Sequence, residues 1–186
     1  KWSDGSPITA HDFVFSWRTA LDPEVVSEYS FLLYSIKNGR NINEGNLPGE
    51  ALGARADGDH KLVVELERPV AFFDKMVAFV TFLPVQEKFY KSRNGRYGAD
   101  ADDMISSGPY IVTQWVHGSN LILKKNPHYW DRDRIHIETI NIAYITSDAT
   151  ATLNFFKDDK IAFTTLLTEN LDNALEERWK IFREQD

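Results

Sequence analysis

The chain has 186 residues, of which 42% are hydrophobic and 26% are charged, and it contains no cysteine. This composition indicates one large or two small folded domains and excludes an intrinsically disordered chain. The missing cysteines exclude disulfide frameworks, cysteine-ligated zinc and thiol catalysis, and the formal charge of −7 argues against nucleic acid as a partner.

The first predicted element is a helix over Ala10–Leu21. Residues 9–12 have the form of a capping box, with Thr first and Asp fourth, although Asp is a weaker match than Glu. Behind the box, apolar residues recur at helical spacing: Phe13, Val14, Trp17 and Leu21. Asp22-Pro23 ends the helix because proline disfavours helical geometry in the residue before it, and Trp17 is expected in the core.

The next predicted elements are a second helix, over residues 27–37, and a hairpin. Asn38-Gly39 is interpreted as a left-handed cap of this helix, and a loop rich in Asn and Gly follows over residues 39–53. Two short segments, Ala54–Ala56 and residues 62–66, flank a Gly-containing turn, which is typical of a β-hairpin. Three residues of the second segment alternate and are expected on one face: Leu62, Val64 and Leu66.

Between this hairpin and residue 103, the sequence predicts two short helices, one apolar segment and one loop. Pro69 opens a helix over residues 70–78, and residues 86–93 form an amphipathic helix. The continuous apolar run at residues 79–85 is interpreted as a buried strand or a crossing between lobes. Residues 94–103, rich in Gly and Asp, are expected to form a surface loop.

Residues 106–131 are the least generic part of the chain. The apolar runs Tyr110–Val116 and 121–123, joined by His117-Gly118-Ser119-Asn120, indicate a second β-hairpin. Asn126-Pro127 ends this hairpin, because proline has no N–H for a strand ladder and extends the residue before it.

After this hairpin a strand is expected over residues 135–145, with a slip in the alternation between Ile137 and Ile140 that suggests a bulge or a late start. The remaining elements are a capped helix, a short strand and a last capped helix: Ala149–Lys157 after Asp148, residues 161–166, and residues 169–179 after Thr168. This order of elements suggests a mixed α/β sheet.

The sequence lacks the patterns typical of catalytic and metal sites, including G-x-S-x-G, H-E-x-x-H, the P-loop and G-x-G-x-x-G. The five histidines have no metal-ligand spacing: His11, His60, His117, His128 and His136. The acidic pairs Asp102-Asp103 and Asp158-Asp159 are interpreted as solvated turn carboxylates. We therefore predict no catalytic residue, no metal and no cofactor. No apolar run approaches the roughly 18 residues of a membrane helix.

Four spaced motifs nevertheless resemble one family, the periplasmic oligopeptide-binding proteins that serve peptide ABC importers. Residues 1–17 resemble its KWSDG-x-P-[VI]-T-A-x-D-F-V-[YF]-SW segment. Ser107-Gly108-Pro109-Tyr110 and residues 126–131 look like its GxY and NPxYWD signatures, and residues 57–66 resemble its DDHTLEVTL hairpin. The motifs occur in the family's order and span nearly the whole chain.

The resemblance implies an α/β fold: a periplasmic-binding-protein-like lobe with a mixed sheet and an attached small α+β domain, present here as a partial chain. Residues 1–85 would form most of the small domain and residues 86–186 the middle segment of the first lobe. The second lobe would lie outside the chain, which opens without methionine or an apolar leader and which we interpret as a fragment.

The implied function is an extracytoplasmic receptor, in the periplasm or on the cell surface, that delivers oligopeptides to the membrane permease of an ABC importer. Such receptors hold the peptide backbone by strand-like pairing and accept varied side chains in hydrated pockets. By position, Tyr29 and Thr165 match pocket tyrosines of the family, and the change to threonine puts the second contact in question. The family signature also implies that Tyr129-Trp130 packs structurally under the lobe.

Two alternatives stay open. One is a relative that binds dipeptides, murein peptides or another small solute, and the other is a carbohydrate-active enzyme, against which the lack of a positioned nucleophile or base counts. We also expect a partial lobe to leave sheet edges uncovered, which favours self-association of the chain.

Overall fold

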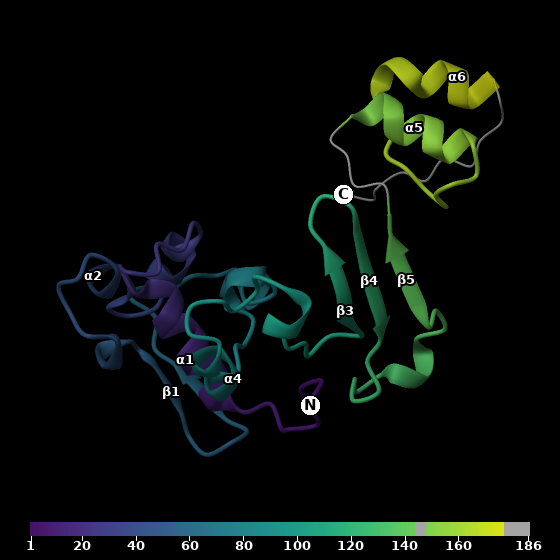
Figure 1. The fold of residues 1–186 in the computed structure, drawn as a ribbon. Helices are drawn as coiled ribbons and strands as arrows, with labels where there is room; N and C mark the ends of the chain where they lie inside the picture. Colours follow the sequence, from purple (N-terminus) through teal and green to yellow (C-terminus); the bar gives the residue numbers. More distant parts are fainter. Residues whose placement is uncertain (144–147, 177–186) are drawn as a thin grey trace. The chain divides into compact units, whose positions relative to one another are not determined.

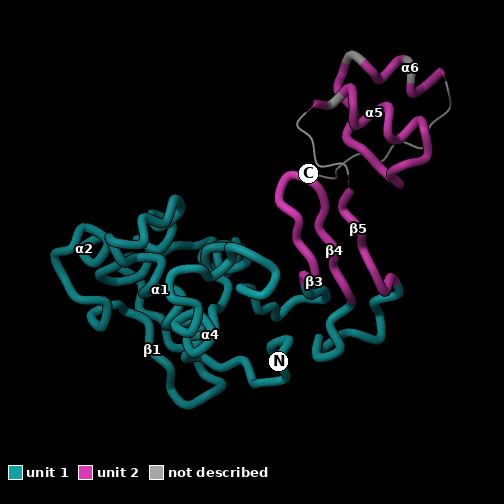
Figure 2. Tube along the Cα trace, in the orientation of Figure 1, with its two compact units in different colours: residues 1–111, 125–136 teal, residues 112–124, 137–186 magenta. Residues whose placement is uncertain are grey.

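The computed structural model describes residues 1–143 and 148–176 and divides into two compact units (Figure 2). The first unit contains residues 1–111 and 125–136, and the second contains residues 112–124 and the described residues from 137 onward.

The first unit is built around α1 (Ala10–Leu21), which has the bounds that the sequence predicts (Figure 1). The capping box is present, with the backbone N–H of Thr9 donating to the Asp12 carboxylate at 2.8 Å. The same carboxylate accepts a hydrogen bond from the indole of Trp2 at 3.3 Å. Trp17 is only 2% exposed, so its expected place in the core is confirmed.

The core forms where α1 meets short elements from the rest of the unit. It consists of eight buried residues: Trp17, Leu21, Leu33, Ile36, Ile42, Leu52, Ala54 and Phe82. The ring centroids of Trp17 and Phe82 lie 5.6 Å apart, edge to face, and the Trp17 indole donates to the Phe82 carbonyl at 3.0 Å. Residues far apart in sequence are therefore joined by both packing and hydrogen bonding.

The second predicted helix differs in kind and in length. Residues 30–35 form a 3-10 helix, η1 (Ser30–Ser35), instead of an α-helix over residues 27–37. The buried positions Ser30, Leu33 and Ile36 recur every third residue, which matches the three residues per turn of a 3-10 helix. Asn38 is left-handed with φ of 65°, and α2 (Gly39–Asn43) follows it inside the segment expected to be a loop.

The first hairpin is confirmed. Strands β1 (Ala54–Ala56) and β2 (Leu62–Val64) pair antiparallel, with Ala54 opposite Val64. Leu62 and Val64 pack against the core, as their alternation predicts. Leu66 lies beyond β2 and forms an isolated bridge with Ile36.

The apolar run at residues 79–85 is not a strand. It contains a 3-10 turn, η3 (Val80–Phe82), in which Phe82 is 1% exposed while Val80 and Leu83 are exposed. Ser16 and Trp17 donate side-chain hydrogen bonds to the carbonyls of Leu83 and Phe82, which attaches this backbone to α1. A continuous apolar run does not reveal such tertiary partners, and this is why the strand prediction was wrong.

Two predicted helices in this region are present but shorter, as α3 (Phe73–Met76) and α4 (Glu87–Ser92). The predicted loop over residues 94–103 contains the 3-10 turn Ala101–Asp103. Asp103 is buried and accepts a charged hydrogen bond from Arg96 Nε at 3.1 Å, so its interpretation as a solvated turn carboxylate was wrong.

A three-stranded sheet follows, in the order β3-β4-β5. The predicted hairpin corresponds to β3 (Tyr110–Val116) and β4 (Asn120–Lys125). Strand β5 (Thr139–Ile142) pairs antiparallel with β4 and begins late, as the slip between Ile137 and Ile140 suggested. Helices and small antiparallel sheets together fit part of an α/β protein.

The last described elements are two helices of the second unit. Asp148 caps α5 (Ala149–Lys157) by accepting the N–H groups of Thr150 and Ala151, as predicted. Residues 161–166 are not a strand; Thr168 opens the 3-10 turn Thr168–Asn170, which leads into α6 (Leu171–Glu176). The predicted strand end at 144–145 and helix end at 177–179 lie outside the described residues. Among those described, no helix is long and apolar enough to cross a membrane.

Candidate ligand-binding site

The opening motif is held by a set of short contacts near the start of α1. Ser3 donates its backbone N–H to the Ser106 carbonyl at 2.8 Å, and Trp2 bonds to Asp12. The Asp4 carboxylate accepts the hydroxyl and N–H of Ser6 and the amide of Gln86. Burial disfavours the charged form of Asp4, but these hydrogen bonds outweigh it and lower its pKa. The contacts that this motif makes are therefore structural.

The predicted site residue Tyr29 directly precedes η1 and is 44% exposed. Its ring lies 5.4 Å from that of Phe79 in an edge-to-face arrangement and 6.1 Å from that of Phe31. Tyr29 is thus a surface aromatic residue and not part of the core cluster.

Tyr29 lines a pocket of about 440 Å³. The other lining residues are Phe31, Leu32, Lys75, Met76 and Phe79. Three aromatic rings, one thioether and one ammonium group surround this space, so it suits an apolar or aromatic side chain. The size is within the range of small-ligand sites.

The sequence did not point to the partners of Tyr29. Phe79 was assigned to an apolar run interpreted as a buried strand or a crossing between lobes, and Met76 to a short helix. The one available signal was the excess of aromatic residues, 13% of the chain, which fits a binding surface as well as a core.

Val26, close to Tyr29, has an unusual backbone. Its φ is 53°, in the left-handed region that β-branched residues rarely adopt, and its side chain is 81% exposed. No burial of the Val26 side chain offsets this strain. Strained residues often cluster at functional sites, and Val26 lies three residues before Tyr29 in the chain.

The second predicted site residue, Thr165, lies in the other unit, in the non-helical segment between α5 and α6. It is exposed, and its carbonyl accepts a long hydrogen bond from the Thr164 hydroxyl at 3.4 Å. Tyr29 belongs to the first unit and Thr165 to the second.

The two residues of the Tyr129-Trp130 pair differ in exposure, since Tyr129 is half-buried and Trp130 is exposed. The ring centroids lie 5.8 Å apart, but Trp130 is 81% exposed on the part of the chain that the structure describes. A large indole exposed to this degree indicates a surface that another element or chain can cover.

Two further pKa shifts among the described residues have structural causes. Burial, with a smaller effect from Tyr90, raises the pKa of Tyr97, and the hydrogen bond to Glu65 raises the pKa of Lys37. These shifts belong to aromatic packing and a surface ion pair. Within residues 1–143 and 148–176, no group of three His, Cys, Asp or Glu residues is arranged to hold a metal.

Comparison with known proteins gives a consistent result. Residues 1–180 match the family described as bacterial extracellular solute-binding proteins, family 5 Middle. The oligopeptide-binding protein OppA of Bacillus subtilis is 36% identical over 156 residues, which are 83% of this chain and 28% of that protein. The dipeptide-binding protein DppE of the same organism is 30% identical over 95% of this chain and 32% of that protein.

A solved structure, Listeria monocytogenes OppA bound to peptide, superimposes with a TM-score of 0.88 and 35% identity. The match covers 96% of this chain and 35% of that one. The chain therefore spans about a third of the length of the relatives that it matches.

Proposed function

The chain belongs to family 5 of the bacterial extracellular solute-binding proteins, and from this membership we propose that it is part of a receptor that binds oligopeptides and delivers them to an ABC importer. The observation that carries the proposal is the likeness in sequence and fold to a peptide-bound OppA over nearly all of this chain. The receptor would act outside the cytoplasm, in the periplasm or on the cell surface, with a membrane permease as partner.

In this proposal the pocket at Tyr29 accepts a side chain of the peptide. Its aromatic lining favours apolar and aromatic side chains without a fixed hydrogen-bond pattern, so many sequences fit. Affinity would come mainly from the peptide backbone, which is common to all peptides and pairs as an added strand does. Thr165 is proposed as a second, weaker contact, because its hydroxyl offers less contact area than a tyrosine ring.

We assign residues 1–85 to a small domain and residues 86–186 to the middle segment of the first lobe. Catalysis is not part of the proposal, since the family is one of solute-binding proteins. A peptide held between two lobes needs both of them, so we expect the isolated chain to bind peptides weakly or not at all.

A dipeptide receptor is the second candidate, favoured by the 30% identity with DppE over 95% of the chain. The two candidates differ in the ligand length that they accept. Native mass spectrometry of the full-length protein, purified without unfolding, separates them. Co-purified peptides of mixed sequence longer than two residues support the oligopeptide receptor; dipeptides alone support the alternative.

A single non-peptide mass, or no bound ligand after peptide addition, would overturn both candidates.

Tyr29→Ala in the full-length protein tests the role of the pocket. We expect weaker binding of peptides with aromatic side chains, by about fivefold to tenfold, which is the contribution of one aromatic contact. Unchanged affinity would remove Tyr29 from the site while leaving the receptor function intact.

A further inference from the structure

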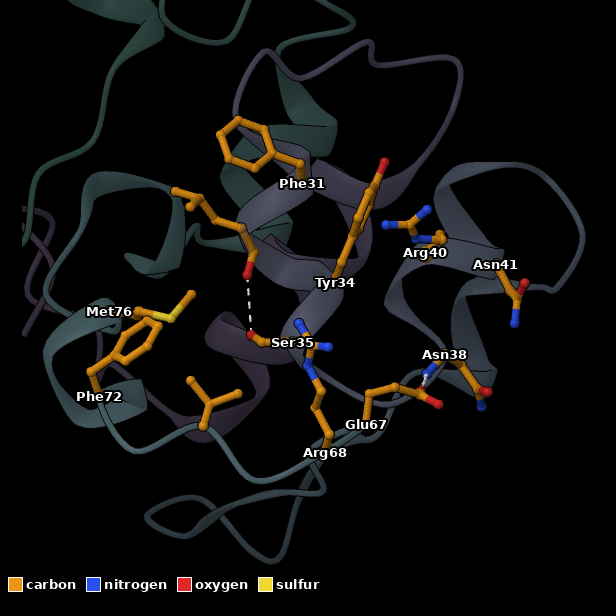
Figure 3. A pocket seen from close by; sticks show the side chains of 12 residues that line it. Phe31, Tyr34, Ser35, Asn38, Arg40, Asn41, Glu67, Arg68, Phe72 and Met76 are labelled. Carbon is orange, nitrogen blue, oxygen red and sulfur yellow. Dashed lines mark hydrogen bonds between the residues drawn. The ribbon is translucent and has the colours of Figure 1, made fainter.

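A second pocket, of about 690 Å³, lies on the same unit, bounded by η1, α2 and the segment that leads into α3 (Figure 3). The two walls of this pocket differ in chemistry. One carries the apolar side chains of Phe72 and Met76, and the other carries Arg40, Asn41, Glu67 and Arg68. Val70 also lines the pocket. In the pocket at Tyr29, by contrast, Lys75 is the one charged residue among the described lining residues.

The charges on the polar wall are unevenly compensated. The Glu67 carboxylate accepts the backbone N–H of Asn38 at 3.0 Å, and its negative charge also acts on Lys37. Arg40 lies over the ring of Tyr34 at 5.1 Å from the centroid. Within the described part of the chain, no carboxylate forms an ion pair with Arg40 or Arg68. The wall thus presents two guanidinium groups and one carboxylate, that of Glu67, which is already engaged by the Asn38 N–H.

We propose that this pocket binds a small amphipathic carboxylate, with its apolar body against Phe72 and Met76 and its carboxylate toward Arg40 and Arg68. Guanidinium groups bind carboxylates through short, charge-assisted hydrogen bonds, often two at a time. The apolar wall contributes by removing the body of the ligand from water. A cationic amphiphile is repelled by the two arginines, and a neutral one gains nothing from them. The site goes beyond the proposed peptide-binding function.

The test is isothermal titration calorimetry of the whole 186-residue chain with octanoate, 1-octanol and octylammonium. The three probes share one apolar body and differ in charge. We expect saturable binding of octanoate, with an affinity at least about fivefold above that of octanol. One partly screened ionic contact contributes a difference of about this size. Octylammonium should bind more weakly than octanol.

Three variants locate the site. Arg68→Gln and Arg40→Gln should each weaken octanoate binding at least about threefold and leave octanol binding unchanged. Val70→Trp, at a half-buried position that lines only this pocket, should block both probes. Arg55→Gln removes an equal charge from exposed Arg55 on β1, outside the pocket, and should have no effect.

Circular dichroism of each variant checks that the fold is kept. Absence of saturable octanoate binding overturns the proposal. Equal affinities for octanoate and octanol, or an Arg55→Gln effect as large as that of Arg68→Gln, overturn it as well.

Discussion

The side-chain amide of Asn126 donates a hydrogen bond to the carbonyl of Gly108 at 2.9 Å. Asn126 is completely buried, its own N–H donates to the Pro109 carbonyl, and its side-chain oxygen accepts the N–H of His128. One residue thereby joins the start of β3 to the end of β4 and fixes the turn after it. The two motifs that resemble the family signatures are thus one structural unit.

Asn126→Ala should lower the free energy of unfolding by about 2–4 kcal/mol, because it removes a fully buried side chain together with its hydrogen bonds to the Gly108 carbonyl and the His128 N–H. Urea denaturation followed by circular dichroism measures the change. Asn46→Ala is the matched control, since Asn46 is exposed and its amide donates to the nearby, exposed Glu44 carboxylate at 3.2 Å. Equal effects of the two substitutions would contradict the structural role of Asn126.

Val26→Gly should raise the free energy of unfolding by about 1 kcal/mol, because glycine adopts positive φ without the Cβ clash that valine has there. Val25→Gly is the control and should lower stability by about 0.5–1 kcal/mol, since it adds chain entropy to the unfolded state and relieves no strain. Thermal unfolding of both variants gives the comparison. Destabilisation by Val26→Gly would show that the valine side chain has a contact that offsets the strain.

The stability of the first unit should depend on pH through Asp4. Its pKa is lower in the folded chain than in the unfolded one. The hydrogen bonds of the carboxylate therefore stabilise the fold above the unfolded pKa, and this contribution is lost as the pH falls through the folded pKa. Asp4→Asn should reduce the loss of stability between pH 7 and pH 3, as measured by urea denaturation at each pH.

Ser6→Ala is the companion variant for this measurement. It removes the hydroxyl donor at 2.6 Å but keeps the backbone N–H of residue 6, so it should reduce the pH dependence only in part. An Asp4→Asn profile identical to that of the unsubstituted chain would show that Asp4 does not contribute to the pH dependence.

The isolated chain should self-associate as its concentration rises. Large apolar side chains are exposed in both units, including Phe72, Trp130 and, at 85% exposure, Phe163. Sedimentation velocity over a hundredfold range of concentration should give an increasing weight-average sedimentation coefficient. The double variant Trp130→Ser and Phe163→Ser should reduce the increase. A monomer over the whole range would contradict the prediction.

Elements whose signals are local could be predicted from the sequence. The capping box of α1, the Asp148 cap of α5 and the first hairpin depend on residues within a few positions of one another. Hydrogen bonds of caps and turns form between neighbours in the chain, so residue types at fixed spacing are enough to identify them. The family resemblance, carried by motifs at similar spacing, was confirmed by comparison.

Tertiary contacts determined the type of the second helix, the structure of the run at residues 79–85 and the pocket at Tyr29. Residues 27–37 carry an apolar pattern that fits an α-helix, but burial of Leu33 and Ile36 selects a 3-10 turn. The run at 79–85 is not a strand because side chains of α1 donate hydrogen bonds to its carbonyls, while Phe82 packs into the core. Tyr29 was predicted as a pocket residue from its position relative to the family. Its pocket, however, forms because Phe79, 50 positions away in sequence, packs against its ring. Burial and long-range hydrogen bonding depend on the whole folded chain, so no local pattern specifies them.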